Sequence, residues 1–128
     1  MPGYELFGAE ERKEVNDVLE TGILMRYGFD GPRKGIWKAK ELEQEICKYF
    51  DAKNAQLVSS GTAALSTAMA ALGIGAGDEV ILPTFTFVAS FEAVIGVGAI
   101  PVLVDIDDTL TLDPQAVERA ITKKTKAV

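Results

Sequence analysis

Residues 79–105, EVILPTFTFVASFEAVIGVGAIPVLVD, hold two short apolar runs on either side of a helical pattern. The runs over residues 79–83 and 101–105 have the length and the aliphatic content of buried strands, whereas residues 88–97 carry apolar side chains at helical spacing. A strand, a helix and a second strand in this order form a βαβ unit with parallel strands. This stretch therefore predicts an α/β fold with a mainly parallel sheet that is buried on both faces.

The flanking sequence continues the alternation of strands and helices. It predicts a short buried strand over residues 56–59, a helix over residues 61–72, a helix from the Asp113 cap to about residue 121, and a further strand that begins at Lys126. Residues 54–128 are therefore expected to hold the first βαβ units of a three-layer α/β/α domain. Because a parallel sheet needs further strands to cover its edge, we expect this domain to be incomplete and the chain to be the N-terminal part of a longer protein.

Residues 1–53 show a different pattern. Apolar side chains at helical spacing predict one amphipathic helix that begins after Gly8 and ends at Gly22, and a second over residues 37–50. The loop between them, residues 21–35, mixes glycines with large polar and aromatic side chains, which is typical of a functional loop. This region is therefore predicted to form N-terminal helices with a functional loop between them.

The composition excludes several kinds of chemistry. The 128 residues contain no histidine, so histidine cannot activate a nucleophile or ligate a metal, and the single Cys47 excludes an internal disulfide. A net charge of −6 argues against a nucleic acid or an anionic membrane as partner, and no apolar run has the length of a membrane span. We expect a cytoplasmic protein with no metal site.

The three acidic residues after the second strand do not change the expectation about metals. Asp105, Asp107 and Asp108 are predicted to end that strand in a solvated turn, although carboxylates so close together are also found in metal sites. The turn interpretation is favoured because Asp113 and Pro114 mark the start of the next helix a few residues later.

A first candidate binding site lies at Ser59–Leu65, where a predicted strand turns into a helix through small residues. The free amides at a helix start, with the positive end of its dipole, allow Gly61 and Thr62 to hold a phosphate. Ser60 could instead be a simple N-cap, and the residue types alone favour that interpretation.

A second candidate site follows at Pro83–Ser90. An aromatic ring at the end of a parallel strand, where ligands of α/β sheets bind, is able to stack on a planar ring. The alternative is that Phe85 and Phe87 are core residues that seal the end of the sheet, and taken alone this alternative is the stronger one.

The glycine-rich loop supplies two cations, Arg26 and Arg33. Guanidinium groups bind carboxylates and phosphates through paired hydrogen bonds, so both residues are candidates for binding a substrate anion. Ordinary surface salt bridges are an equally good explanation of these two residues.

Five ordered motifs resemble the DegT/DnrJ family of sugar aminotransferases, which are pyridoxal-phosphate enzymes of the aspartate-aminotransferase fold, fold type I. They are SSGTAAL (59–65), GIGAGDEVI (73–81), PTFTFVAS (83–90), GAIPVLVDID (98–107) and ITKKTKAV (121–128). The N-terminal segments RYGFD (26–30) and RKGIWKA (33–39) look closest to the subgroup that aminates an 8-oxo-octulosonate, a 3-deoxy-octulosonate-type sugar acid.

The resemblance implies a cofactor and a set of binding residues. Gly61 and Thr62 match the family's phosphate contacts, and Phe87 matches the ring that stacks on the pyridine. The implied enzyme is a cytoplasmic homodimer that takes a keto-sugar, either a sugar acid or nucleotide-linked, with glutamate as amino donor, in the biosynthesis of sugars such as those of cell-surface polysaccharides. A carboxylate on the substrate would give Arg26 or Arg33 a partner.

The resemblance also implies what this chain lacks. The family's lysine that forms the internal aldimine lies later in the pattern than residue 128, and neither Lys123, Lys124 nor Lys126 matches it. We therefore expect no catalytic residue in this chain and no transamination by the chain alone. Two alternatives stay open: a pyridoxal-phosphate-dependent sugar dehydratase of the same family, and a non-catalytic module that binds a phosphorylated ligand or a protein.

Overall fold

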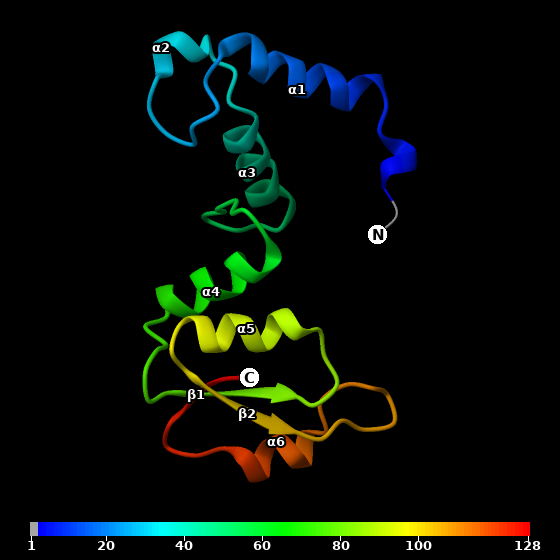
Figure 1. Ribbon diagram of the computed structural model, residues 1–128, viewed down its shortest axis with the longest axis vertical. Helices are drawn as coiled ribbons and strands as arrows, with labels where there is room; N and C mark the ends of the chain where they lie inside the picture. The colour runs from blue at the N-terminus through cyan, green and yellow to red at the C-terminus, as the bar shows by residue number, and fades with distance from the viewer. Residues whose placement is uncertain (1–2) are drawn as a thin grey trace. The chain divides into compact units, whose positions relative to one another are not determined.

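The second half of the chain is built on a parallel sheet of three strands in the order β2-β1-β3. In the register of the central strand β1 (Glu79–Pro83) and β2 (Ile100–Val104), Glu79 lies opposite Ile100 and Pro83 opposite Val104. β3 (Thr125–Ala127) pairs in parallel with the other edge of β1. The computed structural model describes residues 3–128, and this sheet belongs to a unit that spans Val58–Val128 (Figure 1).

Helices cover both faces of this sheet. Because successive strand residues point to opposite faces, β1 contributes to two separate cores. Val80 packs with Val94 of α5 (Val88–Gly96) on one face, and Ile81 packs with Ala116 of α6 (Pro114–Ala120) on the other. Figure 1 shows α5 and α6 on opposite sides of the strands, with α4 (Gly61–Ala71) beside α5. The predicted α/β fold with a parallel sheet between helical layers is confirmed.

One predicted strand is absent. Residues 56–59 were expected to form a short buried strand, but they adopt no regular structure, and Gln56 is exposed. A strand exists only where its backbone groups find a neighbouring strand. Here the Leu57 amide donates to a carboxylate oxygen of Glu43 at 2.8 Å instead. The expectation was wrong because apolar composition alone does not show whether a neighbouring strand is there to pair with.

The first unit, Met1–Leu57, is helical in the part that the structure describes. Its elements are η1 (Tyr4–Leu6), α1 (Ala9–Thr21), α2 (Asp30–Arg33) and α3 (Lys38–Tyr49). α1 ends where Gly22 takes a left-handed conformation with φ of 65°, as a C-terminal glycine cap does. The predicted glycine-rich loop therefore contains one short helix that the sequence pattern did not indicate. None of the helices in residues 3–128 combines the length and apolar character needed to cross a membrane.

Candidate functional site

The start of α4 presents free backbone amides. Ser60 is the N-cap, and its Oγ accepts a hydrogen bond from the amide of Ala63 at 3.1 Å. Its backbone carbonyl accepts from Ala64 at 2.9 Å. The amides of Gly61 and Thr62, by contrast, donate to no acceptor among the described residues. Ser60 therefore caps the helix as predicted, while its two neighbours leave donors available to an anion, and their binding of a phosphate stays a prediction.

A hollow of about 440 Å³ adjoins these amides, and we call it the α4/α5 hollow. Its lining residues come from the starts of two neighbouring helices: Gly61, Thr62, Leu65, Phe87, Ala89 and Ser90. The structure thus brings together the three residues that the sequence singled out as cofactor contacts, although Phe87 is 25 positions or more from the other two in the sequence. Packing of α4 against α5 brings them together, and Ser66 Oγ of α4 lies 3.5 Å from the carbonyl oxygen of Ala93 in α5.

The two phenylalanines of this segment have different surroundings. Both are exposed, Phe85 by 65% and Phe87 by 76%, so neither is a core residue. Phe87 is the N-cap of α5 and lines the hollow, whereas Phe85 does not. The alternative that these rings seal the end of the sheet is therefore wrong, and of the two rings only that of Phe87 lines the α4/α5 hollow.

Sequence analysis missed one polar group in this hollow. Ser90 lies one helical turn after Phe87, and its hydroxyl is 3.1 Å from that of Thr86. The spacing of three residues between Phe87 and Ser90 places both on one face of α5, which was the available signal. Ser90 thus adds a hydroxyl to a hollow otherwise lined by backbone, Thr62 and apolar side chains.

Both arginines that were candidates for binding a substrate anion lie in the first unit, where their hydrogen-bond partners differ. Arg26 Nη2 donates to both carboxylate oxygens of Glu43 at 2.7 Å, and it lies 3.3 Å from Gln56 Oε1. Glu43 is only 7% exposed, although nothing in the sequence distinguished it from other acidic residues of an amphipathic helix. The charge of Arg26 is therefore neutralised within the protein.

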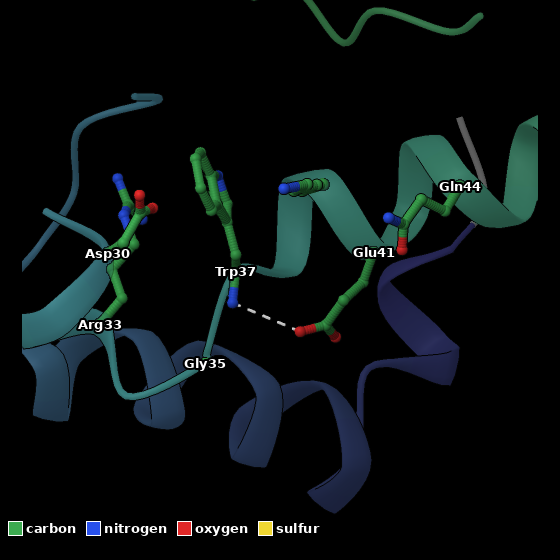
Figure 2. A pocket seen from close by; sticks show the side chains of 7 residues that line it. Asp30, Arg33, Gly35, Trp37, Glu41 and Gln44 are labelled. Carbon is green, nitrogen blue, oxygen red and sulfur yellow. Dashed lines mark hydrogen bonds between the residues drawn. The ribbon is translucent and has the colours of Figure 1, made fainter. Parts of the chain in front are cut away.

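Arg33 is 4% exposed and contacts backbone rather than acid. Its Nε donates to the carbonyl of Gly28 at 2.8 Å, and its Nη2 donates to the carbonyl of Met25. The guanidinium carbon lies 4.5 Å from the centre of the Trp37 ring, a cation–π contact. Figure 2 shows these two side chains close together at the edge of a second hollow in this unit, with the Glu41 carboxylate reaching back to the Trp37 backbone amide.

The acidic turn after β2 is organised by its own hydroxyls. Asp107 Oδ1 accepts from the Thr109 hydroxyl at 2.5 Å and from the Thr109 amide at 2.8 Å, and these bonds hold the pKa of Asp107 below its ordinary value of 3.8. Residues 3–128 include no group of three or more acidic or cysteine side chains arranged to hold a metal ion.

Residues 6–128 match the DegT/DnrJ/EryC1/StrS aminotransferase family. Among curated proteins, the chain is 49% identical over 116 residues to the L-glutamine:2-deoxy-scyllo-inosose aminotransferase of Streptomyces kanamyceticus, an alignment that covers 89% of this chain and 26% of the relative. The chain thus spans about a quarter of that relative's length.

Solved structures agree with this assignment. DesV of S. venezuelae superposes with a TM-score of 0.81 at 40% identity, covering 96% of this chain and 31% of that one. NtdA from Bacillus subtilis, solved with the cofactor PMP bound, superposes with a TM-score of 0.69 at 34% identity, covering 89% of this chain and 26% of that one.

Proposed function

Because this chain belongs to the DegT/DnrJ/EryC1/StrS aminotransferase family, we propose that it forms the N-terminal part of the large domain of a pyridoxal-phosphate-dependent enzyme that transfers an amino group to a keto-sugar. The observation that carries this proposal is the α4/α5 hollow, in which Gly61, Thr62 and Phe87 come together. An accidental resemblance would not be expected to gather these residues around one space.

The residues of the α4/α5 hollow fit a phosphorylated pyridine. The free amides of Gly61 and Thr62, the Thr62 hydroxyl and the positive end of the α4 dipole would hold the phosphate. A side-chain carbon placed on Gly61 would meet no atom within 4 Å, so the space beside this residue is open. The exposed ring of Phe87 would lie against the pyridine. When bound, the cofactor supplies the electron sink for proton removal next to the amine.

The lysine that such chemistry requires is proposed to lie after residue 128. The segment 54–118 contains neither lysine nor arginine, and Lys123, Lys124 and Lys126 are exposed outside the α4/α5 hollow. We therefore infer that the 128 residues hold the phosphate and the ring without carrying out the transfer. In this proposal the residues of this chain position the cofactor, and the lysine that transfers the proton lies outside the 128 residues.

The substrate proposal is narrower. We infer that the acceptor is a keto-sugar that carries an anion, either a 3-deoxy-octulosonate-type sugar acid or a nucleotide-linked sugar, that glutamate is the donor and that the enzyme is a homodimer. The likeness of the 26–30 and 33–39 segments to the octulosonate subgroup supports the sugar acid, and the resemblance to the family supports the donor and the homodimer. The relative named for L-glutamine and 2-deoxy-scyllo-inosose makes glutamine and a neutral cyclic ketone the competing substrates.

The test uses the whole enzyme that carries this sequence, assayed for transfer of labelled nitrogen from glutamate or glutamine to each ketone. Combined Thr62→Ala and Phe87→Ala should abolish the transfer and weaken the binding of pyridoxamine 5'-phosphate, because the phosphate and ring contacts are lost together. Phe85→Ala is the matched control, since its ring does not line the hollow.

Three results would count against the proposal. Transfer that survives the double substitution at unchanged cofactor affinity would contradict the carried-over site. Formation of a dehydrated sugar without nitrogen transfer would indicate the dehydratase. A saturable covalent adduct of pyridoxal phosphate with the 128-residue chain, abolished by one lysine substitution, would show that the chain holds the catalytic amine after all.

A further inference from the structure

A second hollow lies within the first unit and is lined by residues of α2, α3 and the loop between them. It has a volume of about 350 Å³, and we call it the Trp37 hollow. Trp37 and Gly35 line it together with five polar residues: Asp30, Arg33, Lys40, Glu41 and Gln44 (Figure 2). The space is large enough for a monosaccharide, and its lining side chains include both hydrogen-bond donors and hydrogen-bond acceptors.

The cations of this hollow have no acidic partner. Among residues 3–128, no carboxylate lies within salt-bridge distance of Arg33 or Lys40. Arg26 differs in this respect, because Glu43 neutralises it. Buried charges in proteins are normally paired, so a guanidinium that is 4% exposed and has no counter-ion calls for an explanation.

Two nitrogens of the Arg33 guanidinium have partners within the protein, and the third has none among the described residues. The Gly28 and Met25 carbonyls accept from Nε and Nη2, and the Trp37 ring covers one face. Nη1 donates to no acceptor among the described residues, and it is not among their fully buried polar atoms without a partner, so it keeps some contact with solvent. The Arg33 fork is therefore held rigidly by its other two nitrogens while one nitrogen stays free, as in a prepared anion site.

Lys40 places a second charge at the same hollow. Its Nζ lies 4.8 Å from the centre of the Trp37 ring, and the residue lines the hollow together with Arg33. Glu41 is occupied with its neighbours, since it accepts from the Trp37 amide at 3.3 Å and lies 3.8 Å from Lys38 Nζ. Asp30 and Gln44 remain as acceptors for hydroxyl groups.

We propose that the Trp37 hollow binds the anionic group of the keto-sugar, with Arg33 and Lys40 on the anion and Asp30 and Gln44 on its hydroxyls. This deepens the proposed function and rests on it only for calling the ligand a substrate. The anion is a sugar-acid carboxylate or a nucleotide phosphate, since both present oxygens that a guanidinium and an ammonium bind. Arg26, which the sequence ranked equally, has a structural role instead.

Trp37 is the only tryptophan of the chain, so its fluorescence reports on this hollow directly and without any cofactor. The chain is titrated with 3-deoxy-D-manno-octulosonate, with uridine 5'-diphosphate and with the neutral sugar D-glucose. One of the two anions should change the Trp37 emission saturably, and D-glucose should not. Saturation by the sugar acid identifies the carboxylate as the ligand group, and saturation by the nucleotide alone identifies the phosphate.

Two variants test which residues bind. Lys40→Gln should weaken the binding of the anion about tenfold, because it removes one charge-assisted contact at an exposed position that does not hold the fold together. Arg33→Lys keeps the charge and loses the fork, and it should weaken binding at least as much. Lys48→Gln on the same helix is the matched control, because Lys48 does not line the Trp37 hollow, and it should bind as the unsubstituted chain does.

The proposal is overturned if neither anion changes the emission of the folded chain. It also fails if D-glucose binds equally well, or if Lys40→Gln and Arg33→Lys both retain full affinity. These readings are independent of pyridoxamine 5'-phosphate binding at the α4/α5 hollow. If no anion changes the Trp37 emission while pyridoxamine 5'-phosphate still binds, this inference alone is contradicted. If an anion changes the emission but the cofactor does not bind at the α4/α5 hollow, the proposed function alone is contradicted.

Discussion

Both carboxylate oxygens of Glu43 accept hydrogen bonds from a single nitrogen of Arg26, and each oxygen lies 2.7 Å from that Nη2. The same carboxylate accepts the Leu57 amide at 2.8 Å. Glu43 lies in the middle of α3, whereas Arg26 and Leu57 belong to irregular segments on either side of that helix in the sequence. One buried carboxylate therefore holds two segments that belong to no helix or strand.

Replacement of Glu43 by glutamine should lower the free energy of unfolding by about 2 kcal/mol, because Arg26 loses the buried carboxylate that is its counter-ion while an acceptor for the Leu57 amide is retained. Urea denaturation of the chain measures this. Glu45→Gln is the matched control on the same helix, since Glu45 forms only an exposed pair with Lys48. Equal losses for Glu43→Gln and Glu45→Gln would contradict the role given to Glu43.

Ser60→Ala should destabilise the fold by about 1 kcal/mol, because the Ala63 amide loses the acceptor that caps α4. Ser59 is the control, since it is exposed next to the cap and its side chain makes no hydrogen bond among the described residues. Thermal or urea unfolding of the Ser59→Ala and Ser60→Ala variants gives the comparison. If Ser59→Ala is as destabilising as Ser60→Ala, the effect does not come from the cap.

Phe87→Leu should weaken the binding of pyridoxamine 5'-phosphate to the whole enzyme about tenfold, because the leucine side chain lacks the ring face that stacks. Phe85→Leu removes another exposed ring two residues earlier, which does not line the hollow, and should leave the affinity unchanged. Equilibrium dialysis measures both constants. The prediction is wrong if the two variants behave alike.

Acid should destabilise the turn that follows β2. Hydrogen bonds from Thr109 lower the pKa of Asp107 in the folded chain below the ordinary value of 3.8. The unfolded chain therefore takes up this proton first, so the stabilisation is complete above pH values near 3.8 and is lost as the pH falls through the folded pKa. Thr109→Val should raise the pKa of Asp107 toward its ordinary value.

Carboxyl chemical shifts followed by NMR from neutral to acid pH report the pKa of Asp107 directly. Asp107→Asn should flatten the acid side of the stability curve, because no proton is then bound on unfolding at this position. A stability curve that is unchanged by Asp107→Asn would show that the turn does not contribute to acid sensitivity.

Local sequence determined most of the secondary structure. The bounds predicted for β1 agree with Glu79–Pro83, and the helices at 61–72 and 88–97 appear as α4 and α5. Their signals are short-range: an apolar run for a strand buried on both faces, and Ser60 or Asp113 as a helix cap. The sequence also marked Gly61, Thr62 and Phe87, although their roles in binding remain predictions.

Tertiary structure decided what depends on residues far apart in the chain. Residues 56–59 resemble a strand, but no described strand pairs with them, and the Leu57 amide donates to Glu43, 14 positions away. Arg26 and Arg33 were indistinguishable as charges in one loop until folding gave Arg26 a carboxylate and Arg33 only carbonyls and an indole face. A sequence specifies which groups are present and their local spacing, whereas the partner that desolvates or neutralises each group is set by packing.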